Sequence, residues 1–90
     1  MFFAIIALDK PDTLQIRLDN RTAHLSYVDK TGVVEMAGPF LDGSGNMCGS
    51  LLIIAVSNMA DAEKWADDDP YAKAGLFETV SVRKWKKVIG

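Results

Sequence analysis

Two short runs of the chain are apolar at every position, and they constrain the fold more than any other feature. Residues 2–8 (Phe-Phe-Ala-Ile-Ile-Ala-Leu) and residues 51–56 (Leu-Leu-Ile-Ile-Ala-Val) lack the polar alternation of a half-exposed strand. Such runs are too short to span a membrane, and they are typical of strands that are buried on both faces. The chain therefore needs a sheet with two central strands and with cover on each side.

Two helices are predicted between the strands. The first begins at residues 12–13, where Asp or Thr can cap it, and it ends at Gly32. Apolar residues recur along it at helical spacing: Leu14, Leu18, Leu25 and Val28. The second helix begins after Asn58, three residues before Asp61, and runs to residue 68. One more short turn is predicted to begin at Asp69-Pro70, because proline is favoured at the first helical position.

Four strands are predicted, over residues 2–8, 33–40, 47–56 and 77–88, with Gly38-Pro39 closing the second. The order strand, helix, strand, strand, helix, strand gives two split crossover units. Because each crossover is right-handed, these units form a ferredoxin-like βαββαβ sandwich of the α+β class. In that topology the first and third strands are central, in agreement with the two apolar runs. Residues 1–90 form a single domain.

Two helices cover only one face of such a sheet. With 49% apolar residues, the chain would leave too much apolar surface in water on the other face. We therefore expect a homodimer that packs sheet to sheet, with the two-fold symmetry of most small oligomers.

Charge and cysteine content argue against several kinds of partner. The net charge of −2 gives no general attraction to nucleic acid or to an anionic membrane. The basic residues 83–87 are better explained as an edge strand protected by lysines than as an RNA site. Cys48 is the one cysteine, so no intrachain disulfide can form. Together with the lack of a recognisable signal segment, this favours a cytoplasmic protein.

The one histidine, His24, falls on the flank of the apolar stripe of the first helix. Arg17 and Arg21 precede it by seven and three residues, so the three side chains share one surface. A histidine at the edge of a core suits a proton donor or acceptor near neutral pH. The alternative is a partly exposed ring that only covers apolar surface.

Three carboxylates, Asp67, Asp68 and Asp69, stand where the second helix is predicted to end. The helix macrodipole favours cations there, and such a departure from a local rule often marks a functional site. Asp69 can orient an imidazole, or it can simply cap the short turn that follows, and both roles can hold at once. Tyr71 can point its hydroxyl into the same site or only pack its ring.

Other motifs are weak. Ser50 does not lie in a Gly-x-Ser-x-Gly elbow, so a serine hydrolase is not expected. The Gly-rich loop of residues 41–46 is not followed by Lys-Ser or Lys-Thr and is better explained as a hairpin than as a phosphate loop. A metal site would need carboxylates to supplement one histidine and one cysteine, and no motif requires a cofactor.

Several short motifs resemble the YciI-like (YCII-related) family, in order along the whole chain. They are Arg17-Leu18, Arg21, His24-Leu25, Ala37-Gly38-Pro39, Gly49-Ser50, Trp65-Ala66, Asp69-Pro70-Tyr71, Ala74-Gly75, Val80-Ser81-Val82 and Lys86-Lys87-Val88. The resemblance implies a ferredoxin-like fold of the dimeric α+β barrel group. It also implies a His–Asp pair as the suspected active site, which by motif is His24 and Asp69. The loop of residues 41–46 is short for the family, and this leaves the substrate open.

These observations lead to two hypotheses. In the first, the protein is a small acid–base enzyme in which His24 moves a proton and Asp69 fixes its tautomer, without a cofactor or metal. The reaction would be an isomerisation or elimination on a small organic acid or ring compound. Four further side chains are expected to contact the substrate: Arg17, Arg21, Ser50 and Tyr71. In the second hypothesis, the chain is a non-catalytic dimer that binds a small ligand or a partner protein, and the His–Asp pair is sealed and structural.

Overall fold

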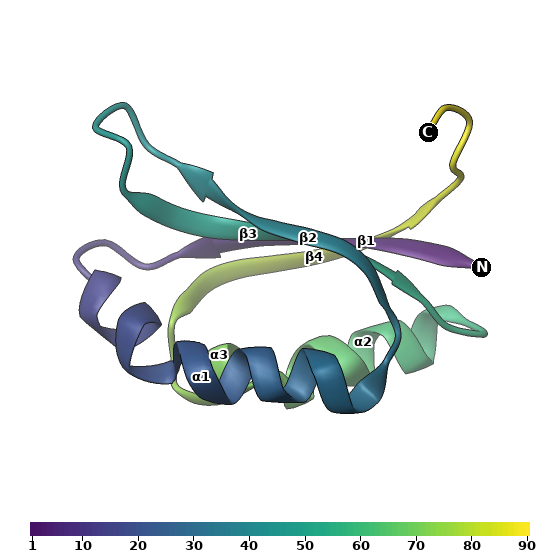
Figure 1. Ribbon diagram of the computed structural model, residues 1–90, viewed down its shortest axis with the longest axis horizontal. Coiled ribbons are helices and arrows are strands. Elements are labelled where there is room, and N and C mark those ends of the chain that lie inside the picture. The colour runs from purple at the N-terminus through teal and green to yellow at the C-terminus, as the bar shows by residue number, and fades with distance from the viewer.

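The computed structural model describes residues 1–90 as a sheet with helices on one of its faces (Figure 1). The strands are β1 (Phe2–Asp9), β2 (Val34–Leu41), β3 (Met47–Ala55) and β4 (Phe77–Trp85). The helices are α1 (Leu14–Thr31), α2 (Met59–Asp68) and the single turn α3 (Pro70–Lys73). No helix is long and apolar enough to cross a lipid bilayer.

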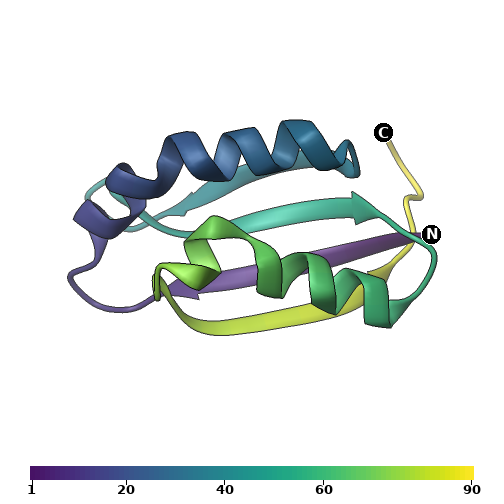
Figure 2. The same ribbon diagram turned by 90° about the horizontal axis from the view of Figure 1, so that it is seen from below.

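The strand order across the sheet is β2-β3-β1-β4, and all neighbouring strands are antiparallel. This is the ferredoxin-like order, so the predicted fold class is confirmed, with β1 and β3 at the centre. Figure 2 shows α1 along the β2–β3 side of the sheet and α2 with α3 along the β1–β4 side. The helices thus form two parallel ridges with the sheet behind them.

The helix ends follow the sequence closely. Asn58 accepts a hydrogen bond from the backbone N–H of Asp61 at 2.8 Å and so caps α2 as predicted. Gly32 adopts a left-handed conformation with φ of 65° and ends α1, again as predicted. Thr13 precedes α1, but its hydroxyl donates to the carbonyl of Lys10 instead of capping the helix.

The strand boundaries differ from the prediction by one residue in β1, β2 and β3, and by three residues at the end of β4. β2 continues through Gly38-Pro39 to Leu41, where a strand end was expected. The sheet tolerates Pro39, which has no N–H to donate, because β2 is an edge strand. β4 ends at Trp85 and not at residue 88.

The apolar core lies between α2 and the two central strands. Its members are Phe3, Ile5, Leu52, Ile54, Ala62, Trp65 and Ala66. Tyr27 of α1 joins this core to the other helix, since its hydroxyl donates to the carbonyl of Trp65 at 2.9 Å. The buried core residues thus come from α2 and the sheet, while α1 packs Tyr27 and Val28 against them.

The apolar stripe of α1 is not its buried face. Leu14, Leu18 and Leu25 are 37%, 48% and 50% exposed, whereas Arg17 and His24 are only 3% and 7% exposed. Helical spacing correctly predicts the helix, but the helix turns its polar flank toward the sheet. This orientation is possible because every buried side-chain nitrogen and oxygen atom has a hydrogen-bond partner.

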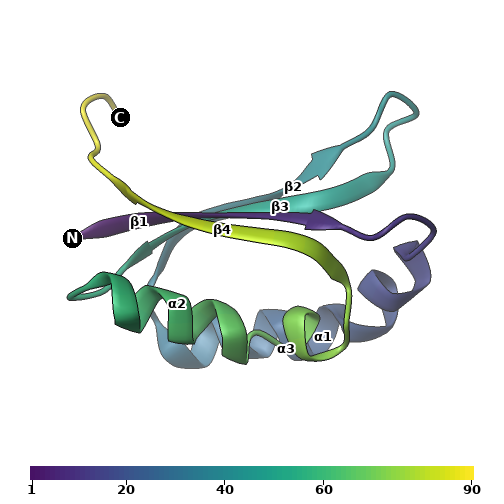
Figure 3. The ribbon, with the colours of Figure 1, turned by 180° about the vertical axis from the view of Figure 1, so that it is seen from behind.

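All helices lie on one side of the sheet, and none covers the opposite face (Figure 3). Phe2, Ala4, Ile6 and Leu8 alternate along β1 with the core residues that point to the helices. On β3, Leu51 and Ile53 alternate in the same way with Leu52 and Ile54. No helix packs over this face, although Ala4 and Ile53 on it are only 8% and 4% exposed.

Candidate active site

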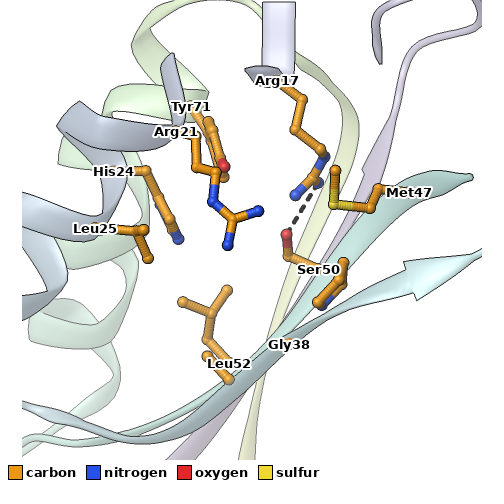
Figure 4. A pocket seen from close by; sticks show the side chains of 11 residues that line it. Arg17, Arg21, His24, Leu25, Gly38, Met47, Ser50, Leu52 and Tyr71 are labelled. Atoms are coloured by element: carbon orange, nitrogen blue, oxygen red, sulfur yellow. Dashed lines mark hydrogen bonds between the residues drawn. The ribbon is translucent and has the colours of Figure 1, made fainter. Parts of the chain in front are cut away.

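A cavity of about 200 Å³ lies between α1, the α3 turn and the strands β2 and β3 (Figure 4). It is lined by polar side chains that the sequence analysis singled out: Arg17, Arg21, His24, Ser50 and Tyr71. Leu25, Met47 and Leu52 give it an apolar wall. Asp69 does not line the cavity but lies behind His24.

His24 and Asp69 form a hydrogen-bonded pair. Nδ1 of His24 lies 2.8 Å from Oδ1 of Asp69, and Asp69 is only 2% exposed. An ionised carboxylate only accepts hydrogen bonds, so the proton of the neutral imidazole lies on Nδ1. The Nε2 atom is thereby left with a free lone pair, and Figure 4 shows the ring directed into the cavity.

Asp69 reaches His24 because of its place at the junction of α2 and α3. Its Oδ1 atom also accepts a hydrogen bond from the backbone N–H of Tyr71 at 2.9 Å, which caps α3. Pro70 occupies the first helical position and fixes the turn. The two roles that the sequence left open, cap and imidazole partner, are thus both filled by one oxygen atom.

The ring of Tyr71 stacks on the ring of His24. Their centroids are 4.0 Å apart and the ring planes differ by 11°. The ring of Phe77 meets the ring of Tyr71 edge-on, with the two centroids 6.1 Å apart. Burial raises the pKa of Tyr71, and this effect outweighs the lowering by the positive charges of Arg17 and Arg21. The phenol therefore keeps its proton at neutral pH and can donate a hydrogen bond.

Arg17 is held in place by other residues of the protein. Its Nε and Nη2 atoms donate to the two carboxylate oxygens of Asp9 at 2.9 and 2.8 Å, and Nη2 also donates to Oγ of Ser50 at 3.0 Å. Burial lowers the pKa of Arg17, but the hydrogen bonds and the charge of Asp9 raise it by more. The pKa of Arg17 therefore lies above its usual value. Arg17 also lies over the ring of Tyr71, with Cζ 4.8 Å from the centroid.

Arg21 differs from Arg17 in both exposure and pairing. It is exposed and makes no ion pair within the chain. Figure 4 shows its guanidinium in the cavity, between His24 and Ser50. Arg21 is therefore the positive charge of this site that is free to meet an anionic ligand.

Sequence reasoning missed Asp9. Its side chain is 5% exposed and forms a bidentate pair with Arg17. The one available indication was its position, a carboxylate directly after a buried strand.

The other carboxylates of the acidic run do not belong to the site. Asp67 is exposed, and Asp68 pairs with Lys64 at 3.1 Å on the surface of α2. Only Asp69 of the three turns inward. No group of three or more His, Cys, Asp or Glu side chains is placed to hold a metal ion.

A βαββαβ sandwich with this strand order places the chain in a class, the small α+β proteins with the dimeric α+β barrel fold. Within that class, the YCII-related domain matches residues 1–86, and the chain belongs to this family. It is 39% identical to Protein YciI of Escherichia coli O6:H1, and 34% identical to an uncharacterized protein of Haemophilus influenzae. Each alignment covers 98% of this chain and 99% of the relative.

Solved structures agree with this assignment. The fold is similar, with a TM-score of 0.88 and 35% identity, to 5-chloro-2-hydroxyhydroquinone dehydrochlorinase (TftG) from Burkholderia phenoliruptrix AC1100 in complex with 2,5-dihydroxybenzoquinone. That alignment covers 96% of this chain and 94% of the dehydrochlorinase. An antibiotic biosynthesis monooxygenase, at 12% identity and a TM-score of 0.60, shares the fold alone.

Proposed function

We propose that this protein is a small acid–base enzyme in which His24 takes a proton from a compact, hydroxylated ring compound. The observation that carries the proposal is the arrangement of one imidazole: Nδ1 is bound to the buried Asp69, while Nε2 is free and opens into a cavity. A sealed structural pair would leave no such free atom. The carboxylate also stabilises the imidazolium that forms once the proton has moved.

The size of the cavity restricts the substrate. Its volume of about 200 Å³ is below the roughly 300–1,000 Å³ of pockets that hold drug-sized ligands. A single six-membered ring with a few substituents fits this space. The dehydrochlorinase was solved with such a molecule, 2,5-dihydroxybenzoquinone, and this likeness supports a ring substrate for the present chain.

The polar side chains suggest how the ring is held. Arg21 is free to pair with an ionised hydroxyl or carboxyl group of the substrate, because guanidinium binds such oxygens well. Tyr71 offers a phenolic donor, and Ser50 a hydroxyl whose oxygen already accepts from Arg17. These groups hold the anion while His24 receives the proton.

The proposed reaction needs no oxidant, reductant or second substrate, because only a proton and an electron pair move. His24 removes a proton from an O–H or C–H group of the ring, and the electrons left behind either shift a double bond or expel a leaving group. In an isomerisation the proton returns to another atom of the same ring. In an elimination it leaves with the expelled anion as an acid.

The proposed assembly is a dimer of two sheets face to face. The uncovered apolar face described above, formed by β1 and β3, supports it. Burial of such a face is the dominant favourable term in protein association.

The experiment that tests the function uses a panel of hydroxylated and chlorinated hydroquinones and benzoquinones in D₂O. Product formation is followed by mass spectrometry, and hydrogen–deuterium exchange at the ring by NMR. Wild type is expected to catalyse exchange or turnover of at least one compound, and His24→Gln is expected to lose it. Asp67→Asn, an exposed carboxylate of the same run, is the matched control. If wild type binds a compound with no exchange or turnover, the chain is a binding module instead.

A further inference from the structure

We infer that Asp9 is a positioning residue of this site: by pairing with Arg17 it cancels a buried positive charge that would otherwise oppose protonation of His24. Its importance for turnover rests on the function proposed above, in which His24 accepts a proton. Its effect on the charge of His24 can be measured without any substrate.

The Asp9–Arg17 pair is built into the sheet. Asp9 is the last residue of β1, where the pairing of β1 with β4 shifts register after Leu8. By strand alternation it lies on the helix side of the sheet, as Phe3 and Ile5 do. The side chains of Asp9 and Arg17 are 5% and 4% exposed, so water does little to screen either charge.

A continuous stack of contacts connects this pair to the proposed base. The guanidinium of Arg17 lies 4.8 Å from the centroid of the Tyr71 ring, and the same ring stacks on His24 at 4.0 Å. Figure 4 shows Tyr71 between the two. The order of groups is therefore carboxylate, guanidinium, phenol, imidazole and carboxylate, with Asp9 at one end and Asp69 at the other.

The charges that face His24 come from two of the elements packed around it, α1 and the α3 turn. Helix α1 contributes Arg17 and Arg21, and the α3 turn contributes the neutral Tyr71 with Asp69 at its cap. Strands β2 and β3 line the cavity only with uncharged residues. Because Arg21 is exposed and solvated, Arg17 is the cation whose charge must be cancelled within the protein.

The geometry gives three variants with different expected results. Asp9→Asn leaves Arg17 buried and unpaired, and a nearby like charge disfavours the imidazolium. Arg17→Gln leaves the Asp9 carboxylate unpaired and favours the imidazolium. The double variant removes both charges and should restore the balance. A purely structural role for Asp9 would not produce shifts of opposite sign that cancel.

The test is an NMR titration of the untagged protein, in which His24 is the one histidine. The midpoint is expected to move to lower pH in Asp9→Asn, by about half a unit or more, and to higher pH in Arg17→Gln. In the double variant it should return to within about 0.2 units of wild type. Asp67→Asn serves as the control for a generic loss of one negative charge. Folded Asp9→Asn protein with a wild-type midpoint would overturn the inference.

The inference can still be tested if one or both of the single variants fail to fold. If Asp9→Asn does not fold, the comparison of Arg17→Gln with the double variant decides, since equal midpoints would mean that Asp9 contributes no charge effect. If neither single variant folds, the double variant must match wild type, and a departure larger than about half a unit overturns the inference. If the midpoints shift as stated but no ring compound reacts, the proposed reaction fails while the role of Asp9 stands.

Discussion

His24 and Asp69 are 45 residues apart in sequence, yet Nδ1 of the histidine lies 2.8 Å from Oδ1 of the aspartate. The same oxygen accepts the backbone N–H of Tyr71, whose ring stacks on the histidine. One atom therefore fixes the tautomer of the imidazole, starts the α3 turn and places the tyrosine that covers His24. Substitutions at Asp69 can separate these roles.

Asp69→Asn should retain most of the stability and lose the activity. Asparagine caps a helix about as well as aspartate, whereas Asp69→Ala loses about 1 kcal/mol from the cap alone. Neither variant supplies the negative charge that stabilises an imidazolium. Urea unfolding at fixed protein concentration gives the stability order wild type, Asn, Ala, and the deuterium-exchange assay gives the activity. An active Asp69→Asn enzyme would show that the carboxylate is only a cap.

The titration of His24 tests directly whether Asp69 is only a helix cap or also a charged partner of the imidazole. With the carboxylate replaced by an amide, the midpoint for protonation of the ring should move to lower pH, because a favourable charge beside the imidazolium is gone. NMR of the His24 ring protons as a function of pH, in wild type and in Asp69→Asn, measures this midpoint. Asp68→Asn, one residue away but directed to Lys64 on the surface, should titrate as wild type does.

The two arginines should give opposite results when replaced by glutamine. Arg21→Gln removes an exposed, unpaired charge, so the melting temperature should hardly change while the binding of an anionic ring compound weakens. Arg17→Gln leaves a buried carboxylate without its partner, and breaking such a pair costs about 3 kcal/mol of stability. Thermal unfolding and ligand titration by calorimetry measure both. Equal loss of binding with equal stability would contradict the assignment of separate roles.

The sequence predicted the topology from strong local patterns, whereas the His–Asp pair was implied by the family resemblance. The runs of residues 2–8 and 51–56 identify the central strands, and Asp69-Pro70 is a cap with little conformational choice. Family likeness, more than spacing, joined Asp69 to His24. The distance between the two could be known only once α1 and the α3 turn were placed side by side.

The orientation of α1 and the role of Asp9 could not be predicted in the same way. Hydrophobic periodicity assumes that leucines turn inward, but α1 buries Arg17 and His24 and leaves Leu18 half exposed. A polar residue can be buried when remote strands supply its partners, here Asp9 from β1 and Ser50 from β3. No local pattern reports such partners, because they come together only in the tertiary fold.

Tyr27 should make stability sensitive to alkaline pH. Burial, with the negative charges of Asp68 and Asp69, raises the pKa of Tyr27 to about 12 from its ordinary value of 10.0. Since the raised pKa belongs to the folded state, protonated Tyr27 contributes to the stability of the fold. This contribution is complete below pH 10 and is lost as the pH rises toward 12. Between these two pH values, the absorbance of tyrosinate measures the ionisation, and unfolding curves measure the loss of stability. In Tyr27→Phe the alkaline loss should be smaller, while stability at neutral pH falls because the hydrogen bond to Trp65 is absent.

The uncovered sheet face should make the protein a dimer in solution. Ile6 lies at the centre of that face, on β1 between its partners Leu51 of β3 and Ser81 of β4. A lysine there would place a charge in the proposed interface, where it would be buried without a partner. Light scattering at micromolar concentration is expected to give twice the chain mass of 9.8 kDa for wild type and a lower mass for Ile6→Lys. Leu18→Lys, an apolar residue exposed on α1 and away from the sheet face, is the matched control and should remain dimeric. A folded, monomeric wild type would refute the sheet-to-sheet assembly.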